Sequence, residues 1–195
     1  MNPIPPFTEF AKIARLSRNC VITEKIDGTN GSILIADDLD PFVTSEGGVP
    51  FLVGSRNRWL TLAADNFGFA RWAYANVDEL LKLGPGQHFG EWWGYGIQRR
   101  YGLNEKRFSL FNTARWLPAQ ADGKLPACVS IVPVLFEGIF SSTAVDEALA
   151  LLVREGSKAA PGFMDPEGVV IYQTAGRCYF KKTIKKDEEP KGLQR

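Results

Sequence analysis

Short stretches with alternating apolar and polar residues, or with clustered β-branched and aromatic residues, recur along the chain between turn-forming residues. Such stretches are typical of β-strands. The predicted strands are residues 20–26, 31–37, 51–55, 87–93, 107–113, 131–138, 168–174 and 178–184.

Two further segments have apolar residues at helical spacing. The first covers residues 63–83, and Gly84-Pro85-Gly86 ends it. The second begins at Thr143, where Thr143-Ala-Val-Asp146 resembles a capping box, and runs to Gly156. The order of these elements predicts an α+β fold with mostly antiparallel sheets and two main helices.

Turn signals separate the predicted strands. Asp27-Gly28 lies between the first two strands, and Asp-Gly is a common two-residue hairpin turn when apolar alternation flanks it. Ala175-Gly176-Arg177 separates the last two strands. We therefore expect a β-hairpin at each place. Residues 37–50 and 118–126 are polar and are predicted to be loops.

The length of 195 residues suits one sizeable core and is short for two independent domains. One domain is expected over residues 1–186, followed by a charged, flexible tail at 187–195. No apolar run approaches the length of a membrane span, and the N-terminus lacks the basic start and apolar core of a signal peptide. We expect a cytoplasmic protein.

The composition excludes some kinds of site. With one histidine, His88, the chain cannot host a multi-histidine metal site, and His88 is predicted to be an ordinary strand residue. The three cysteines match no metal-ligand spacing and are expected to be reduced and mostly buried. The net charge of +1 does not by itself indicate nucleic-acid binding, although local basic patches matter more than the total.

Lys25 stands between two acids in the stretch TEKIDGTNGS, residues 23–32. It is either a solvated residue of an ordinary hairpin or a nucleophile that the turn fixes at the end of a strand. The letters K-x-D-G should occur by chance in roughly one chain in 20 of this length, but E-K-x-D-G-T-N only once in ~10⁵ such chains. The longer stretch favours the nucleophile if other motifs support it.

Four other places carry uncommon combinations on or beside predicted strands: GSRNRW (54–59), FGEWWG (89–94), RFSLFN (107–112), and PEGVVIY with YFKK (166–172, 179–182). Together with the first stretch they resemble, in order, the six collinear motifs of the covalent nucleotidyltransferases, which include ATP-dependent DNA and RNA ligases and mRNA capping enzymes. KIDGTN and GEWWGYGIQRRYG are most similar to RNA ligases, particularly the small phage-type enzymes.

The resemblance implies an ATP-grasp-like ligase adenylation domain, located in the host cytoplasm if a phage encodes it. Since only about a dozen residues follow the last motif, we expect no C-terminal OB-type domain. In that family the first-motif lysine, here Lys25, attacks the α-phosphate of ATP and becomes a lysyl-AMP. A free lysine is almost entirely protonated near pH 7, so it needs desolvation or nearby positive charge. The resemblance supplies that charge as Mg²⁺ or Mn²⁺ near Glu167 and as Lys181 and Lys182.

The resemblance also assigns roles near the first two motifs. Asp27 and Gly28 would form the turn that presents Lys25, and Glu24 would belong to the nucleotide-binding set. Arg56 resembles the arginine that contacts the nucleotide and then the substrate phosphate. Arg58 is the alternative, and a solvated arginine is the competing interpretation.

Three later residues are assigned in the same way. Glu91 would accept hydrogen bonds from the ribose hydroxyls as an ionised carboxylate, or it is simply a carboxylate at a strand edge. Phe111 would stack on adenine, although a Phe in an alternating strand is usually part of the core. Glu167 would bind the metal, since Mg²⁺ prefers a few carboxylates together with waters and substrate oxygens.

The last motif departs from the family pattern K-x-K, because Lys181 and Lys182 are adjacent. Adjacent strand residues point to opposite faces, so only one of the two should reach the phosphate. Lys181 is slightly favoured, since Tyr179 and Thr183 would share its face.

The resulting hypothesis is a monomeric, ATP-dependent RNA ligase that transfers AMP from Lys25 to a 5′-phosphate end and seals this end to a 3′-hydroxyl. A GTP-dependent capping enzyme and a nucleotide- or RNA-binding module without turnover are the alternatives. Arg99, Arg100 and the segment 181–195 are candidate phosphate contacts, the last with six Lys or Arg against three Asp or Glu. A solvated tail is an equal alternative.

Overall fold

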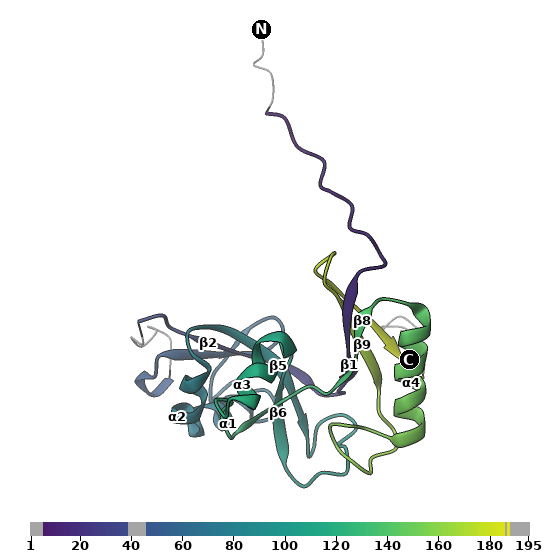
Figure 1. Ribbon diagram of the computed structural model, residues 1–195. Helices are drawn as coiled ribbons and strands as arrows, with labels where there is room; N and C mark the ends of the chain where they lie inside the picture. The colour runs from purple at the N-terminus through teal and green to yellow at the C-terminus, as the bar shows by residue number, and fades with distance from the viewer. Residues whose placement is uncertain (1–5, 39–45, 186, 188–195) are drawn as a thin grey trace, which may run out of the picture.

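The computed structural model describes residues 6–38, 46–185 and 187. It contains two β-sheets, and helical segments cover one face of each (Figure 1). All strand neighbours are antiparallel except β6 and β7. The predicted α+β fold with mostly antiparallel sheets is confirmed. The predicted tail lies outside the described residues apart from residue 187, as does the middle of the predicted loop 37–50.

The first sheet has four strands and the second has six. In spatial order the first sheet consists of β10 (Cys178–Thr183), β9 (Gly168–Gln173), β1 (Asn19–Lys25) and β8 (Val134–Ile139). The second consists of β4 (Trp59–Leu60), β3 (Phe51–Gly54), β2 (Thr29–Ile35), β5 (Gly86–Gly94), β6 (Lys106–Leu110) and β7 (Val129–Ile131).

The predicted hairpin at Asp27-Gly28 is wrong, although both of its strands exist. Strand β1 pairs with β8 and β9, whereas β2 pairs with β3 and β5, so residues 26–28 cross from one sheet to the other. Side chains satisfy the backbone of this crossing: the Asp27 N–H donates to the Tyr101 hydroxyl (2.7 Å) and the Gly28 N–H to Glu91 Oε1 (3.1 Å). The hairpin of β9 and β10 is confirmed.

The first predicted helix is shorter and interrupted. It begins at Phe69, because the preceding residues form turns in which the Asp65 carboxylate accepts the Asn66 and Ala70 N–H groups. Asn76 then separates two helical pieces. The pieces are α1 (Phe69–Ala75), α2 (Val77–Leu80) and the 3₁₀ turn η2 (Leu81–Leu83); a further 3₁₀ turn, η1, covers Glu46–Gly48.

Of the two remaining helices, one is not predicted and the other is. Helix α3 (Thr113–Ala121) occupies part of the predicted loop 118–126; Asn112 caps it by accepting the Arg115 N–H (3.2 Å). Helix α4 (Ser142–Glu155) agrees with the prediction, but its cap is Ser141, whose hydroxyl accepts the Ala144 N–H (3.1 Å). The predicted strand 131–138 covers the last residue of β7 (Val129–Ile131) and all but the last residue of β8 (Val134–Ile139).

His88 has the expected structural role, whereas only one of the three cysteines is fully buried. His88 is buried in β5, its Nε2 lies 2.8 Å from the Gly84 carbonyl oxygen, and burial lowers the pKa of its ring. The three cysteines are free, and Cys20 is fully buried whereas Cys128 and Cys178 are half-buried. Within the part of the chain that the structure describes, no helix is long and apolar enough to cross a membrane.

Each sheet buries one face under helices. Helix α4 packs on the first sheet, and helices α1 and α3 contribute to the core of the second; Figure 1 shows α4 on the side of the first sheet away from the second. The first core consists of Cys20, Ile22, Val169 and Ile171 with Ala144, Val145, Ala148 and Leu152. Because successive strand residues alternate in direction, Lys25 points away from α4.

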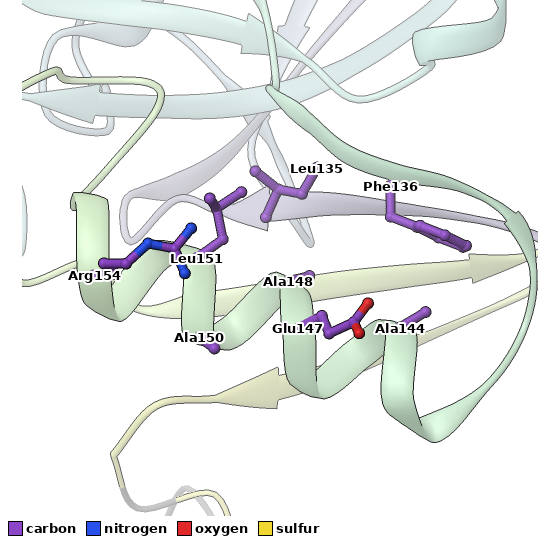
Figure 2. A pocket seen from close by; sticks show the side chains of 8 residues that line it. All are labelled: Leu135, Phe136, Ala144, Glu147, Ala148, Ala150, Leu151 and Arg154. Carbon is purple, nitrogen blue, oxygen red and sulfur yellow. The ribbon is translucent and has the colours of Figure 1, made fainter.

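A groove of about 300 Å³ runs between α4 and β8 (Figure 2). Its apolar lining includes Leu135, Phe136 and Leu151, and Glu147 and Arg154 stand on α4 beside it. It lies on the α4 side of the first sheet, whereas Lys25 points to the other side.

The crossing between the sheets yields a stability prediction. A Cβ atom at Gly28 would lie 2.4 Å from the Trp92 carbonyl oxygen and 2.7 Å from the Trp93 Cβ atom, both fixed in buried strand residues. Gly28→Ala should therefore lower the free energy of unfolding by about 1–3 kcal/mol in chemical denaturation. Gly138→Ala is the control, because its Cβ would meet only the Phe136 ring, which can turn. Equal stabilities of the two variants would contradict the prediction.

Candidate active site

Lys25 is the last residue of β1 and lies opposite Gly168 of β9. Its Nζ donates to Glu167 Oε2 at 2.5 Å, and the side chains of Lys25 and Glu167 are only 18% and 8% exposed. Gly168 allows the neighbouring strand to approach, since a Cβ there would lie 2.2 Å from the Lys182 carbonyl oxygen. The structure thus joins the first motif to a glutamate 142 residues later in a mostly buried ion pair.

Glu91 faces this ion pair from the second sheet. Its Oε1 accepts a hydrogen bond from the Gly28 N–H (3.1 Å). Its Oε2 accepts one from Nδ2 of Asn30 (3.2 Å), which lies opposite Glu91 on the neighbouring strand. Burial raises the pKa of Glu91 to about 7; the Lys25 charge and the two hydrogen bonds oppose this rise, whereas Glu167 adds to it. Burial therefore disfavours the ionised form of Glu91, and its contact with the ribose hydroxyls stays a prediction.

Arg99 links the crossing to the segment before Glu167. Its Nε donates to Asp27 Oδ2 (3.0 Å), and its NH1 donates to the Asp165 carbonyl (3.0 Å) and carboxylate (2.7 Å). Lys185 also pairs with Asp165 (2.7 Å), and the hydrogen bond from Lys185 is the main cause that lowers the pKa of Asp165. Arg99 was predicted to contact a nucleic-acid phosphate; its contacts in the structure are with these two carboxylates.

Tyr101 holds the crossing from the same loop. Its backbone is left-handed (φ 52°), its side chain is buried, and its hydroxyl accepts the Asp27 N–H. Burial raises the pKa of Tyr101, and the negative charges of Glu24, Asp27 and Glu167 raise it further. The phenol is thus a neutral group beside three carboxylates.

Glu24, although next to Lys25 in sequence, points to the opposite face of the first sheet. Its carboxylate accepts hydrogen bonds from the Ser157 hydroxyl (2.5 Å) and from the N–H groups of Lys158 (2.7 Å) and Ala159 (2.9 Å). It is 1% exposed, and burial raises its pKa despite these bonds. The side chain therefore anchors the segment after α4, and its assignment to the nucleotide-binding set stays a prediction.

Lys181 and Lys182 point to opposite faces of β10. Lys182 lies opposite Val169 on the α4 face, and its Nζ donates to Asp146 of α4 (2.8 Å). Lys181 lies opposite Val170, on the face to which Lys25 points, and is exposed. It makes no side-chain hydrogen bond or ion pair with another residue of the described ranges.

Phe111 continues the register of β6 beside β5. Its N–H donates to the Phe89 carbonyl oxygen (3.0 Å), which continues the ladder in which Leu110 lies opposite Gly90. By alternation this register places Phe111 on the Glu91 side of the second sheet. The side chain is half-buried against the cluster that contains Trp93, so it is also partly a core residue.

The predicted arginines lie in exposed loops. Arg56 follows β3, and Arg56 and Arg100 have no side-chain partner among the described residues. Arg58 instead donates to backbone carbonyls, most closely that of Ala64 (2.7 Å), and holds the following turn. Strand β3 is antiparallel to β2, and Gly54 lies opposite Ser32. Arg56, two residues after Gly54, is therefore near the start of β2, next to the crossing.

Sequence reasoning missed Asn30 and Asp165 as parts of the site. Asn30 is visible in the first motif, but its partner Glu91 follows only from the pairing of β2 with β5. Asp165 stands two residues before Glu167, a weak signal, and its pairing with Arg99 depends on the fold of the 95–105 loop.

The donor set around Glu167 suits a divalent cation that a nucleotide helps to bind. No group of three or more His, Cys, Asp or Glu side chains able to hold a metal occurs in residues 6–38, 46–185 and 187. Mg²⁺ commonly takes only one or two carboxylates and completes its shell with waters and phosphate oxygens. Glu167, with Glu91 nearby, fits that arrangement.

Comparison with known proteins identifies a family. The sequence model of a family described as RNA ligase matches residues 18–186. No curated protein matches the chain. Several similar solved structures are of the Naegleria gruberi RNA ligase: a lysine-to-alanine mutant with ATP and Mn has a TM-score of 0.58 and 21% identity, and covers 86% of this chain and 50% of that one.

Two further structures of that ligase agree with this result. A glutamate-to-alanine mutant with ATP and Mn has a TM-score of 0.58 and 20% identity, covering 92% of this chain and 57% of that one. A lysine-to-methionine mutant with AMP and Mn has a TM-score of 0.58 and 21% identity, with coverages of 86% and 50%. The chain thus spans about half the length of these proteins and shares their fold.

The raised pKa of Glu91 leads to a prediction of pH dependence. Between its ordinary pKa of 4.5 and about 7, folded Glu91 keeps a proton that the unfolded chain has released, so the contribution of this group to stability falls as the pH rises. Glu91→Gln removes the titration. The unfolding temperature of the variant, relative to wild type, should therefore rise between pH 5 and pH 8. A constant difference across that range would contradict the assignment.

Proposed function

The chain belongs to the RNA ligase family, and we propose that it is an ATP-dependent RNA ligase that uses Lys25 as its nucleophile. The observation that carries this proposal is the ion pair of Lys25 with Glu167 at the junction of the two sheets, opposite Glu91. A partly buried amine at a strand end, beside two carboxylates on helix-free faces, suits covalent chemistry on a phosphate better than it suits a structural role.

In the proposed first step Lys25 Nζ attacks the α-phosphorus of ATP. An N–P bond forms, the bond to pyrophosphate breaks, and Nζ loses two protons: one before the attack, because an ammonium group has no free electron pair, and one as the phosphoramidate forms. Glu167 Oε2, at 2.5 Å, is the nearest acceptor for the first of them. The same ion pair engages the amine before ATP binds, so reactivity requires the pair to loosen. A divalent cation at Glu167 would supply positive charge that offsets the phosphates and competes with Lys25 for this carboxylate.

The later steps are phosphoryl transfers of the same kind. An oxygen of the RNA 5′-phosphate attacks the lysyl-AMP phosphorus, the N–P bond breaks, and Nζ regains a proton. The RNA 3′-hydroxyl then attacks the activated 5′-phosphate, a phosphodiester bond forms, and AMP leaves. Positioning and charge neutralisation do most of the work in such reactions.

The remaining residues have proposed positions around the nucleotide. Glu91 would hold the ribose hydroxyls and Phe111 would stack on adenine, since both belong to the same face of the second sheet. Lys181 is preferred to Lys182 as the cation at the α-phosphate, because Lys182 is occupied by Asp146 on the other face. Arg56 would contact the substrate phosphate. The ligase would act as a monomer in the cytoplasm.

The labelling of Lys25 tests the proposal directly. With α-labelled ATP and Mg²⁺, wild-type protein should become covalently labelled, and Lys25→Ala should not. Unlabelled ATP should compete with the label far better than GTP, whereas a capping enzyme would show the reverse. Equal labelling of wild type and Lys25→Ala would disprove the nucleophile, and absence of label from both would favour a binding module without turnover.

Arg99 is expected to act as a positioning residue in the first step. It joins Asp27, two residues after Lys25, to Asp165, two residues before Glu167, so its loss should loosen the Lys25–Glu167 geometry. Arg99→Ala should slow single-turnover labelling by about tenfold to a hundredfold without RNA, since small misplacements cost that much. Asp165→Asn should show the same direction of change.

Arg71→Ala, an exposed arginine of α1, serves as the control and should label at the wild-type rate. If Arg99 acts only on RNA, Arg99→Ala will label normally and fail later, in transfer or sealing. That outcome would return Arg99 to the role expected from the sequence. Arg99→Lys should recover little of the rate, because a point charge cannot bridge two carboxylates as the guanidinium does.

A further inference from the structure

The helix-free face of the first sheet carries an aromatic pair, of which one ring is exposed and the other is half-buried. Tyr172 of β9 and Tyr179 of β10 lie directly opposite each other, with ring centroids 4.7 Å apart and planes inclined by 35°. Tyr179 is 67% exposed. Figure 1 shows α4 covering the other face of this sheet. Tyr179 therefore leaves most of an aromatic surface open to solvent on the side of the sheet where Lys25 points.

The register connects this pair to Lys25. Along β9, Tyr172, Val170 and Gly168 share one face, and Gly168 lies opposite Lys25. Tyr172 and Gly168 are four residues apart, which is about 13 Å at 3.3 Å per residue. The tyrosine pair is thus on the same face as the reactive amine and a short distance from it.

Positively charged residues stand two positions before and two positions after Tyr179 in the sequence. Lys181 shares the face of Tyr179 and stands between it and the Lys25 end of the sheet. Arg177, in the turn before β10, is exposed and has a left-handed backbone (φ 49°). Neither side chain has a hydrogen bond or ion pair within the described part of the chain. The surface therefore offers an aromatic platform with a free cation on each side.

A purely structural role accounts for part of this arrangement only. Cross-strand aromatic pairs stabilise antiparallel sheets, and Tyr172 is half-buried. A ring that is two-thirds exposed contributes little burial, however, and the neighbouring cations add nothing to sheet stability. Proteins that hold single-stranded nucleic acids combine these two features, because bases stack on aromatic rings while cations neutralise the backbone.

We propose that Tyr172, Tyr179, Lys181 and Arg177 bind a single-stranded segment of the polynucleotide substrate, with a base stacked on Tyr179 and the backbone running past Lys181 toward Lys25. The inference rests on the proposed function, since it identifies the bound strand with the RNA whose end reacts at Lys25. It assigns this strand to the first sheet, whereas the nucleotide lies against Glu91 and Phe111 of the second.

Binding of a fluorescent, 5′-phosphorylated single-stranded RNA oligonucleotide, followed by anisotropy, tests the inference. Tyr179→Ala should raise the Kd by about tenfold or more, in line with the loss of one base stack. Tyr179→Phe should stay within about twofold of wild type, because the ring rather than the hydroxyl carries the contact. Phe180→Ala is the matched control: Phe180 is the next residue, is 57% exposed and lies on the α4 face.

Covalent labelling by ATP without RNA separates the two proposals. Tyr179→Ala should label at the wild-type rate, since the first step does not use the Tyr179 ring. If wild type fails to label but Tyr179→Ala still weakens RNA binding, the ligase proposal fails and the binding surface stands. If Tyr179→Ala binds RNA as wild type does, or if Phe180→Ala weakens binding equally, the surface is disproved.

Discussion

The chain passes from one sheet to the other within three residues, Ile26 to Gly28, and the geometry of the site depends on this crossing. There is no room for a side chain at Gly28, because the backbone of Trp92 and the Cβ of Trp93 lie against its Cα. The Asp27 and Gly28 N–H groups find partners in side chains of the second sheet and its loop. Lys25 is therefore held at the junction, where groups from both sheets reach it.

The acids that surround Lys25 in space differ from those beside it in sequence. Glu24 points to the other face and is fully used in anchoring the segment after α4, while Asp27 is paired with Arg99. The carboxylates that face the amine are Glu167, at 2.5 Å, and Glu91. Before substrate binds, the amine is engaged in its ion pair with Glu167, and burial, which the Lys25 charge opposes, raises the pKa of Glu91. Reactivity must therefore arise with the substrate.

Periodicity predicted most strands, helix α4 and the final hairpin, because these depend on local patterns of burial. It could not predict how the strands divide between two sheets, since Asp27-Gly28 gives the same local signal in a hairpin as in a crossing. Helix α3, which Asn112 caps, is not predicted, because the preceding alternation favours a strand and the polar residues from Pro118 favour a loop. For Arg99, the fold of its loop provides two carboxylates that the sequence could not predict, and its contact with a phosphate stays a prediction.

Strand alternation explains how one sheet serves both scaffold and chemistry. In β1, Glu24 binds the segment after α4 and Lys25 faces the site; in β10, Lys182 pairs with α4 and Lys181 is left free. In both strands the anchoring residue is the immediate neighbour of the one proposed to act on the nucleotide, so contacts on the α4 face fix the backbone at both positions. The adjacent lysines that depart from the K-x-K spacing follow from this: one lysine holds the strand to α4, and only its neighbour shares the face of Lys25.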